Sequence, residues 1–219
     1  MNSSRVLFLL FFYLCVPAAA HDYWLKPLKS GVELVYGHAK ESQSYQRSVM
    51  KSLTAYDKQG KALAGKPTFF QDTFRLQVPG AASYLAVVDD GPWVKTVRGW
   101  KRGLKKDHSG VVSSTWDRYY AKFSSDKGPP LGQTLEIVVD DLKGRVSGQV
   151  LFQGQPLQDA TLEVNHKKVG KTDAQGRFSL TESAANPLII RVAHKEKGTS
   201  GVDWAQHIST LTLMRNVAK

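Results

Sequence analysis

Short apolar stretches separated by Gly, Pro, Asn and Asp extend from residue 21 to the end of the chain. In 32–36 and 74–78 apolar and polar residues alternate, which is typical of a strand with one buried face. The stretch 84–88 is continuously apolar and ends at a turn signal, Asp-Asp-Gly-Pro at 89–92. The predicted strands are 32–36, 74–78, 84–88, 116–123, 135–139, 146–152, 160–164, 178–180, 188–193 and 207–214.

One of these stretches fits two structures. Trp116, Tyr120 and Phe123 match one face of a helix, but aromatic residues also favour strands, and we interpret 116–123 as a strand. The evenly spaced short strands then predict an all-β fold made of two β-sandwich-like modules. The polar stretch 140–144 marks the boundary between the predicted domains, 21–142 and 143–219.

The first twenty residues have the layout of a secretory signal peptide. Arg5 supplies a positive start, 6–16 is an unbroken apolar run, and Ala18 and Ala20 are the small residues before a cut after Ala20. The run is shorter than the roughly 20 residues of a transmembrane helix, although an uncleaved anchor is the alternative. We therefore expect an exported, periplasmic protein. Removal of the signal peptide 1–20 would leave a mature chain that begins at His21.

The composition excludes several function classes. The one cysteine, Cys15, lies within the apolar run, so the mature chain has no disulfide framework and no Cys-rich metal site. The sequence also contains no phosphate-binding glycine loop and no Gly-x-Ser-x-Gly motif. We therefore expect a protein without enzymatic turnover.

Basic residues exceed acidic ones by 30 to 19, which gives a formal charge of +11. Part of this excess lies in one segment where basic residues alternate with tryptophans, a composition that can bind nucleic acid or anionic polymers. Because an exported protein rarely meets nucleic acid, we expect none as a partner and interpret the segment as a solvated loop that an anionic surface attracts. It contains Trp93, Lys95, Arg98, Trp100, Lys101, Arg102, Lys105 and Lys106.

The histidines offer a more specific chemistry. A cut after Ala20 makes His21 the terminal residue, so that its free amine and its ring Nδ1 can chelate one metal ion. Reference pKa values of about 7.7–8.0 for the amine and about 6.5 for the ring let a metal displace both protons near neutral pH. This arrangement is called a histidine brace when a second histidine completes it. The carboxylate of Asp22 would either ligate the ion or orient a ring.

His38 is the first candidate for the second histidine, because it follows Gly37 at the end of a predicted strand. His194 and His207 lie at the ends of two later strands and complete the predicted metal ligands His21, His38, His194 and His207. Imidazole ligands suit a divalent transition metal, namely nickel, cobalt, copper or zinc, better than Mg or Ca. His108 and His166 lie in polar stretches and are expected to be exposed turn residues.

The opening His-Asp-Tyr-Trp-Leu-Lys-Pro at 21–27 resembles that of a family of exported proteins associated with nickel and cobalt uptake. Tyr-Gly-His at 36–38 is similar to the Gly-His element of that family, and 93–96, 99–101, 119–122, 193–194 and 210–213 also look similar. The stretches 150–157 and 172–178 resemble its C-terminal module, which is similar to carboxypeptidase-regulatory and transthyretin-like β-sandwiches. The resemblance implies a periplasmic accessory protein that holds nickel or cobalt for the membrane components of a metal transporter.

The sequence thus favours a metal-binding protein, with nickel as the first choice and cobalt, copper or zinc as alternatives. Two other functions stay open at this point. A histidine brace that holds copper can activate oxygen, which would make the protein an oxidoreductase acting on a polysaccharide. A β-sandwich could instead bind a cell-wall polymer through Trp93, Trp100 and the basic segment, with the histidines incidental.

Overall fold

The protein is all-β, as predicted. The computed structural model describes residues 21–38, 41–125, 127–141, 145–180, 187–199 and 201–214. Across these residues the regular structure is β-strand, apart from two single 3₁₀ turns at Arg47–Val49 and Lys105–Asp107. No helix in these ranges is long and apolar enough to cross a membrane. The predicted signal peptide and its cut after Ala20 lie outside the described residues.

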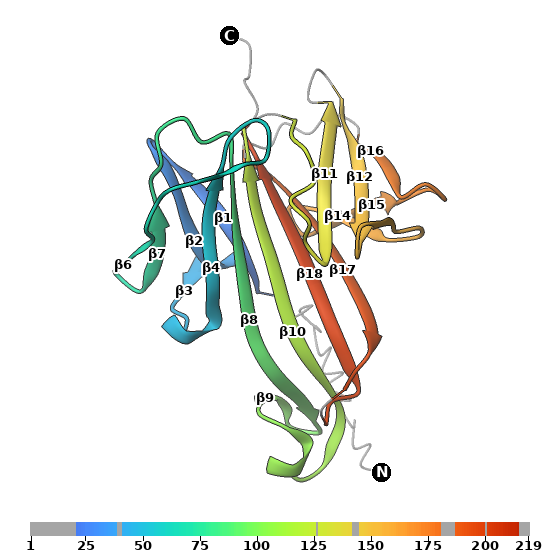
Figure 1. The fold of residues 1–219 in the computed structure, drawn as a ribbon. Coiled ribbons are helices and arrows are strands. Elements are labelled where there is room, and N and C mark those ends of the chain that lie inside the picture. Colours follow the sequence, from blue (N-terminus) through green and yellow to red (C-terminus); the bar gives the residue numbers. More distant parts are fainter. Residues whose placement is uncertain are drawn as a thin grey trace, which may run out of the picture.

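Three sheets make up the described fold (Figure 1). The first sheet contains β1 (Asp22–Leu28), β2 (Gly31–His38), β3 (Glu41–Gln43), β6 (Thr68–Phe70) and β7 (Thr73–Leu76). The central sheet contains β4 (Met50–Tyr56), β5 (Ala62–Leu63), β8 (Ser83–Thr96), β9 (Gly99–Arg102), β10 (Val111–Ser124), β14 (Thr161–Val164), β15 (Lys167–Lys171), β17 (Leu188–Lys197) and β18 (Trp204–Leu213). The third sheet contains β11 (Leu135–Asp141), β12 (Val146–Phe152), β13 (Gln155–Pro156) and β16 (Arg177–Leu180).

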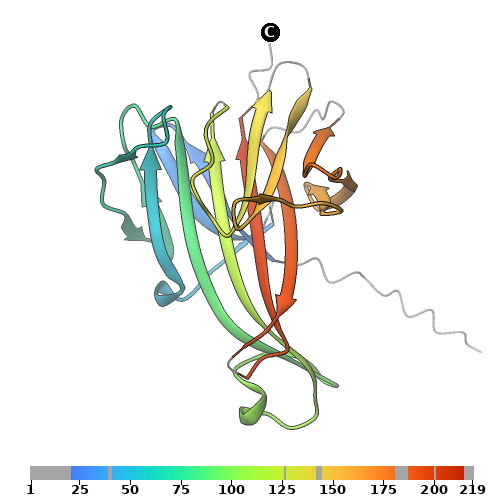
Figure 2. The ribbon, with the colours of Figure 1, turned by 45° about the vertical axis from the view of Figure 1, so that its right-hand side comes forward.

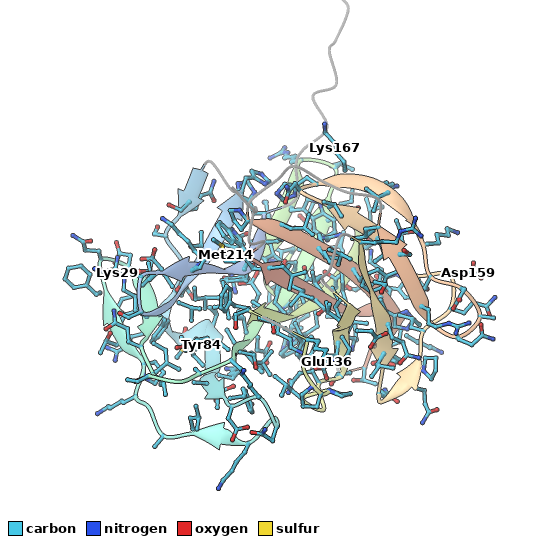
Figure 3. The ribbon with its side chains drawn as sticks, turned by 90° about the horizontal axis from the view of Figure 1, so that it is seen from above. Lys29, Tyr84, Glu136, Asp159, Lys167 and Met214 are labelled. Atoms are coloured by element: carbon cyan, nitrogen blue, oxygen red, sulfur yellow. The ribbon has the colours of Figure 1, made fainter. Side chains whose placement is uncertain are left out.

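The central sheet is covered on both faces. In Figure 2 the yellow strands β11 and β12 lie in front of it and the blue strands β1 and β2 behind it. Side chains alternate along β8: Ala86 and Val88 join the core shared with the first sheet, whereas Leu85 packs in the core shared with the third. Viewed from above, Lys29 after β1 and Asp159 before β14 lie at opposite sides of the molecule (Figure 3).

The predicted domain boundary does not separate the sheets. Residues 142–144 at that boundary lie outside the described residues. On either side of it, β10 and β18 pair in parallel from Thr115–Trp204 to Ser124–Leu213, and β11 pairs with β12. Strands from both predicted domains therefore share the central sheet and the third sheet.

The predicted strand 116–123 is confirmed as part of β10, but the turn predicted at 89–92 is wrong. The strand β8 continues through these residues to Thr96, and its pairing with β10 skips Asp90, which marks a bulge. The two aspartates that favoured the turn prediction, Asp89 and Asp90, have hydrogen-bond partners inside the fold. Asp89 accepts a hydrogen bond from Trp116 Nε1 at 2.6 Å, and Asp90 accepts one from Trp93 Nε1 at 2.8 Å. Because both carboxylates are hydrogen-bonded inside the fold, the strand continues through these residues instead of ending in a turn.

Candidate metal centre

The first strand places His21 beside His38. Asp22 pairs with Gly37 in the antiparallel register of β1 and β2, so the residues just beyond this pair are neighbours across the two strands. The imidazole rings of His21 and His38 lie 4.8 Å apart, centroid to centroid. Gly37 has φ of 133°, a conformation that favours glycine, next to the residue that carries the ligand. The structure thus brings together the two histidines on which the brace prediction depends.

A third histidine joins them from a distant part of the sequence. Nδ1 of His38 lies 3.3 Å from Nε2 of His166, and the two rings meet edge to face with centroids 4.6 Å apart. His166 is a turn residue, as expected, but the expectation that it is merely exposed is incomplete because its ring contacts the predicted site. The cluster of His21, His38 and His166 is called the histidine cluster below.

The turn that carries His166 is anchored. Val164 pairs with Lys167, so Asn165 and His166 form a two-residue hairpin turn, and their φ values of 45° and 66° fit a type I′ turn. Asn165 is tied to Ile189 on β17 twice: its N–H donates to the Ile189 carbonyl at 2.9 Å, and its side-chain oxygen accepts from the Ile189 N–H at 3.0 Å. The position of the third histidine is therefore set by strand pairing and by this clamp.

Asp22 connects the histidine cluster to Arg191, a half-buried arginine of β17. Nε of Arg191 lies 2.9 Å from both carboxylate oxygens of Asp22, and Nη1 of Arg191 lies 3.2 Å from Oε2 of Glu163. Oδ2 of Asp22 is also 4.0 Å from Nδ1 of His166, the ring nitrogen that does not face His38. A carboxylate beyond the outer nitrogen of a histidine fixes the orientation and tautomer of the ring in many metal sites. This arrangement fits an orienting role for Asp22.

Burial controls the ionisation of this region. It raises the pKa of Asp22, even though the Arg191 guanidinium favours the ionised carboxylate. Partial burial also lowers the pKa of His166, with Asp22 opposing the shift and the neighbouring His38 adding to it. A lowered pKa keeps the His166 imidazole neutral near neutral pH, which is the form that binds a metal.

The other two predicted ligands, His194 and His207, lie on the opposite face of the central sheet. They face each other across β17 and β18, and both rings contact Phe152 of the third sheet, at 4.3 and 5.5 Å between centroids. Arg191, which holds Asp22, is an odd number of positions from His194 on β17, and alternation along a strand sends the two side chains to opposite faces. The structure therefore does not bring His194 and His207 to the histidine cluster.

Both ring nitrogens of His207 already have protein partners. Nδ1 lies 3.1 Å from the Tyr120 hydroxyl oxygen, and Nε2 lies 3.0 Å from Oε1 of Glu196. The residue is 2 % exposed, and burial lowers its pKa. These contacts are those of a satisfied core histidine. His108 directly follows the 3₁₀ turn Lys105–Asp107 but is half-buried rather than exposed, and its Nε2 lies 2.9 Å from the Arg102 carbonyl oxygen.

Sequence comparison assigns the chain to a family without assigning a function. A domain family described as a domain of unknown function, DUF4198, matches residues 18–196. The chain belongs to the DUF4198 family. The matched range of this DUF4198 member contains the whole histidine cluster and His194, whereas His207 lies beyond it. A search of the curated proteins finds no match.

Side chains alone do not form a ready metal site in this DUF4198 protein. Within the described ranges, no three His, Cys, Asp or Glu side chains are grouped so that they could hold a metal ion. The histidine cluster supplies two ring nitrogens 3.3 Å apart, on His38 and His166, with the His21 ring next to them. Two nitrogens bound to one tetrahedral ion at about 2.0–2.1 Å are separated by about 3.3–3.4 Å. The separation of these two nitrogens thus matches that of two ligands on one ion, and a site would need a further ligand from His21.

Proposed function

We propose that the protein binds one divalent transition-metal ion at the histidine cluster, with His21 acting as the N-terminal residue of the exported chain. The observation that carries the proposal is the convergence of His21, His38 and His166 from β1, β2 and the β14–β15 turn. Cleavage after Ala20 would give His21 a free amine, so its amine and ring would form one chelate. The rings of His38 and His166 would complete the ligands.

Nickel or cobalt is the cargo that we propose, because the opening residues and the Gly-His element resemble a family associated with the uptake of these metals. The protein would then act in the periplasm as a carrier or buffer, would deliver the ion to membrane components of a transporter, and would perform no chemical turnover. Copper and zinc bind the same ligand types, and copper binds most tightly in the Irving–Williams order. Competition between metals in solution therefore does not identify the biological cargo.

The test compares the chain that begins at His21 with a chain that keeps one additional residue before it. The extra residue replaces the terminal amine by an amide and removes one chelate ring, while the fold stays the same. Calorimetric titration with Ni²⁺ should show one ion per chain for the native terminus and at least tenfold weaker binding for the extended chain. His38→Ala should weaken binding in the same way, and His108→Ala should leave it unchanged. Equal binding by the native and extended chains would refute the brace.

A further inference from the structure

One end of the molecule carries an exposed tip that the metal site does not use. The strands β8 and β10 run past the end of β4, and β9 folds back at their far end, which forms the projection at the bottom of Figure 1. We define the hairpin tip as residues 95–112 together with Trp204, which pairs with Thr115 at its base.

Large apolar side chains gather on this tip. Val97 is 84 % exposed, Val112 65 %, Trp100 54 % and Trp204 44 %. These four belong to the seven large apolar side chains that are exposed in the described part of the chain. Single exposed apolar residues are ordinary, but a group of them at one projecting end is typical of a surface that binds something.

The same tip is strongly basic. Residues 95–112 contain six Lys or Arg and one Asp. Two of these cations have acidic partners: Arg102 Nη2 lies 2.8 Å from Oδ1 of Asp90, and Lys105 is paired with Asp203. The exposed side chains of Arg98, Lys101 and Lys106 form no ion pair within the described residues. Their charge is therefore available to an anionic partner.

We infer that the hairpin tip docks on a bilayer of anionic phospholipid. Tryptophan prefers the headgroup level of a membrane, and Lys and Arg beside it are attracted to anionic headgroups. Trp100 and Val97 would enter the headgroup layer while Lys101 and Lys106 meet phosphates. A soluble anionic polymer could use the charges and the tryptophans, but it offers nothing to the exposed aliphatic side chains of Val97 and Val112, so the combination favours a membrane surface. This inference is independent of the metal site.

The experiment measures flotation of the purified protein with two kinds of vesicle, phosphatidylcholine alone and phosphatidylcholine mixed with phosphatidylglycerol. Binding should be at least tenfold stronger to the anionic vesicles and should weaken at high salt. Trp100→Ala and the double variant Lys101→Glu/Lys106→Glu should each lose about tenfold or more. The matched controls are Phe70→Ala, an exposed aromatic on β6, and Lys58→Glu/Lys61→Glu, two exposed lysines beyond β4. Both controls should bind like the unchanged protein.

Tryptophan fluorescence with brominated lipids gives a second readout. Quenching by the anionic vesicles should be clear in the unchanged protein and much reduced in Trp100→Ala. Circular dichroism of every variant confirms that it is folded. The inference is overturned if the protein ignores anionic vesicles, if it binds dextran sulfate but no vesicle, or if Trp100→Ala binds as well as the unchanged protein. It is equally overturned if the controls lose as much binding as the tip variants.

Discussion

Nδ1 of His38 lies 3.3 Å from Nε2 of His166, although 128 positions separate the two residues in the chain. The contact joins the end of β2 in the first sheet to a hairpin turn at the edge of the central sheet. The clamp between Asn165 and Ile189 fixes that turn, so the pair of nitrogens is held by the fold rather than by its own hydrogen bond. When both rings are neutral, one proton lies between these two nitrogens, and a metal ion would bind both once that proton has moved to another ring nitrogen.

His166→Ala tests this relationship. If His166 is a ligand, its removal should weaken Ni²⁺ binding at least tenfold in the chain that begins at His21, with the fold unchanged, because one imidazole donor is lost. His108→Ala is the matched control, since His108 is a loop histidine whose Nε2 lies 2.9 Å from the Arg102 carbonyl oxygen and which contributes nothing to the histidine cluster. Calorimetric titration measures both variants. Equal affinity of His166→Ala and His108→Ala would remove His166 from the site.

The ten predicted strands could be found because alternation and turn residues are local signals, but β1, β4 and β15 were not among them. The turn that was predicted at 89–92, where β8 in fact continues, shows the limit of local signals. Asp-Asp-Gly-Pro signals a turn when its carboxylates face water, but Trp116 and Trp93 donate to them here. Trp93 lies three residues after Asp90 on β8 itself, but Trp116 comes from the neighbouring strand β10, and a local pattern does not contain that donor.

The candidate site was predictable only in part, for a similar reason. His21 and His38 could be found because a terminal histidine and a Gly-His at a strand end are visible in the sequence. His166 carries a weaker local signal, an Asn-His pair between two strands, and only the packing of that turn brings it to His38. The alternation of side chains along a strand predicts that His194 and Arg191 point to opposite faces of the sheet. The sequence does not indicate which of these two faces carries the histidine cluster.

Arg191→Met should destabilise the protein by about 3–5 kcal/mol, because it leaves the buried carboxylate of Asp22 without its partner. The side chains of Arg191 and Asp22 are 15 % and 5 % exposed, so little solvent screens the pair. The double variant Asp22→Asn/Arg191→Met should recover part of the loss, since the buried charge of Asp22 is then gone and only the more exposed Glu163 lacks its partner. Urea unfolding at neutral pH measures the three proteins. A loss below about 1 kcal/mol for the single variant would contradict this account.

Metal binding should weaken as pH falls, because protons compete for the same imidazole and amine nitrogens. His166 has a lowered pKa, so its ring should stay available to lower pH than an ordinary histidine. The affinity for Ni²⁺ should fall steeply between about pH 7.5 and pH 5.5, where the amine and ordinary histidine rings gain protons. Titrations at three pH values in this interval check the slope. An affinity that does not change with pH would exclude histidine ligands.

Asp117→Asn should stabilise the protein at neutral pH but not near pH 4. Oδ1 of Asp117 is hidden from solvent and has no hydrogen-bond partner in the described structure. Burial raises the pKa of Asp117 to about 6, and the nearby Asp90 adds to the shift while Thr115 opposes it. Between about pH 4 and pH 6 the folded protein therefore holds more protons than the unfolded chain, and stability falls as pH rises.

The cost of ionising Asp117 is complete above its folded pKa of about 6, and relative to the ordinary pKa of an aspartate it amounts to about 2–3 kcal/mol. Asparagine avoids that cost because it stays neutral, so urea unfolding at pH 7 should show a gain of up to about 2 kcal/mol. Near pH 4 the aspartate is already protonated in the folded state, and the two proteins should be nearly equal. Asp72→Asn, at an exposed position, is the control and should change stability little at either pH. An Asp117→Asn variant that is less stable at pH 7 would show that the Asp117 carboxylate has a partner in solution, and one that gains equally at both pH values would show that ionisation of Asp117 is not the cause.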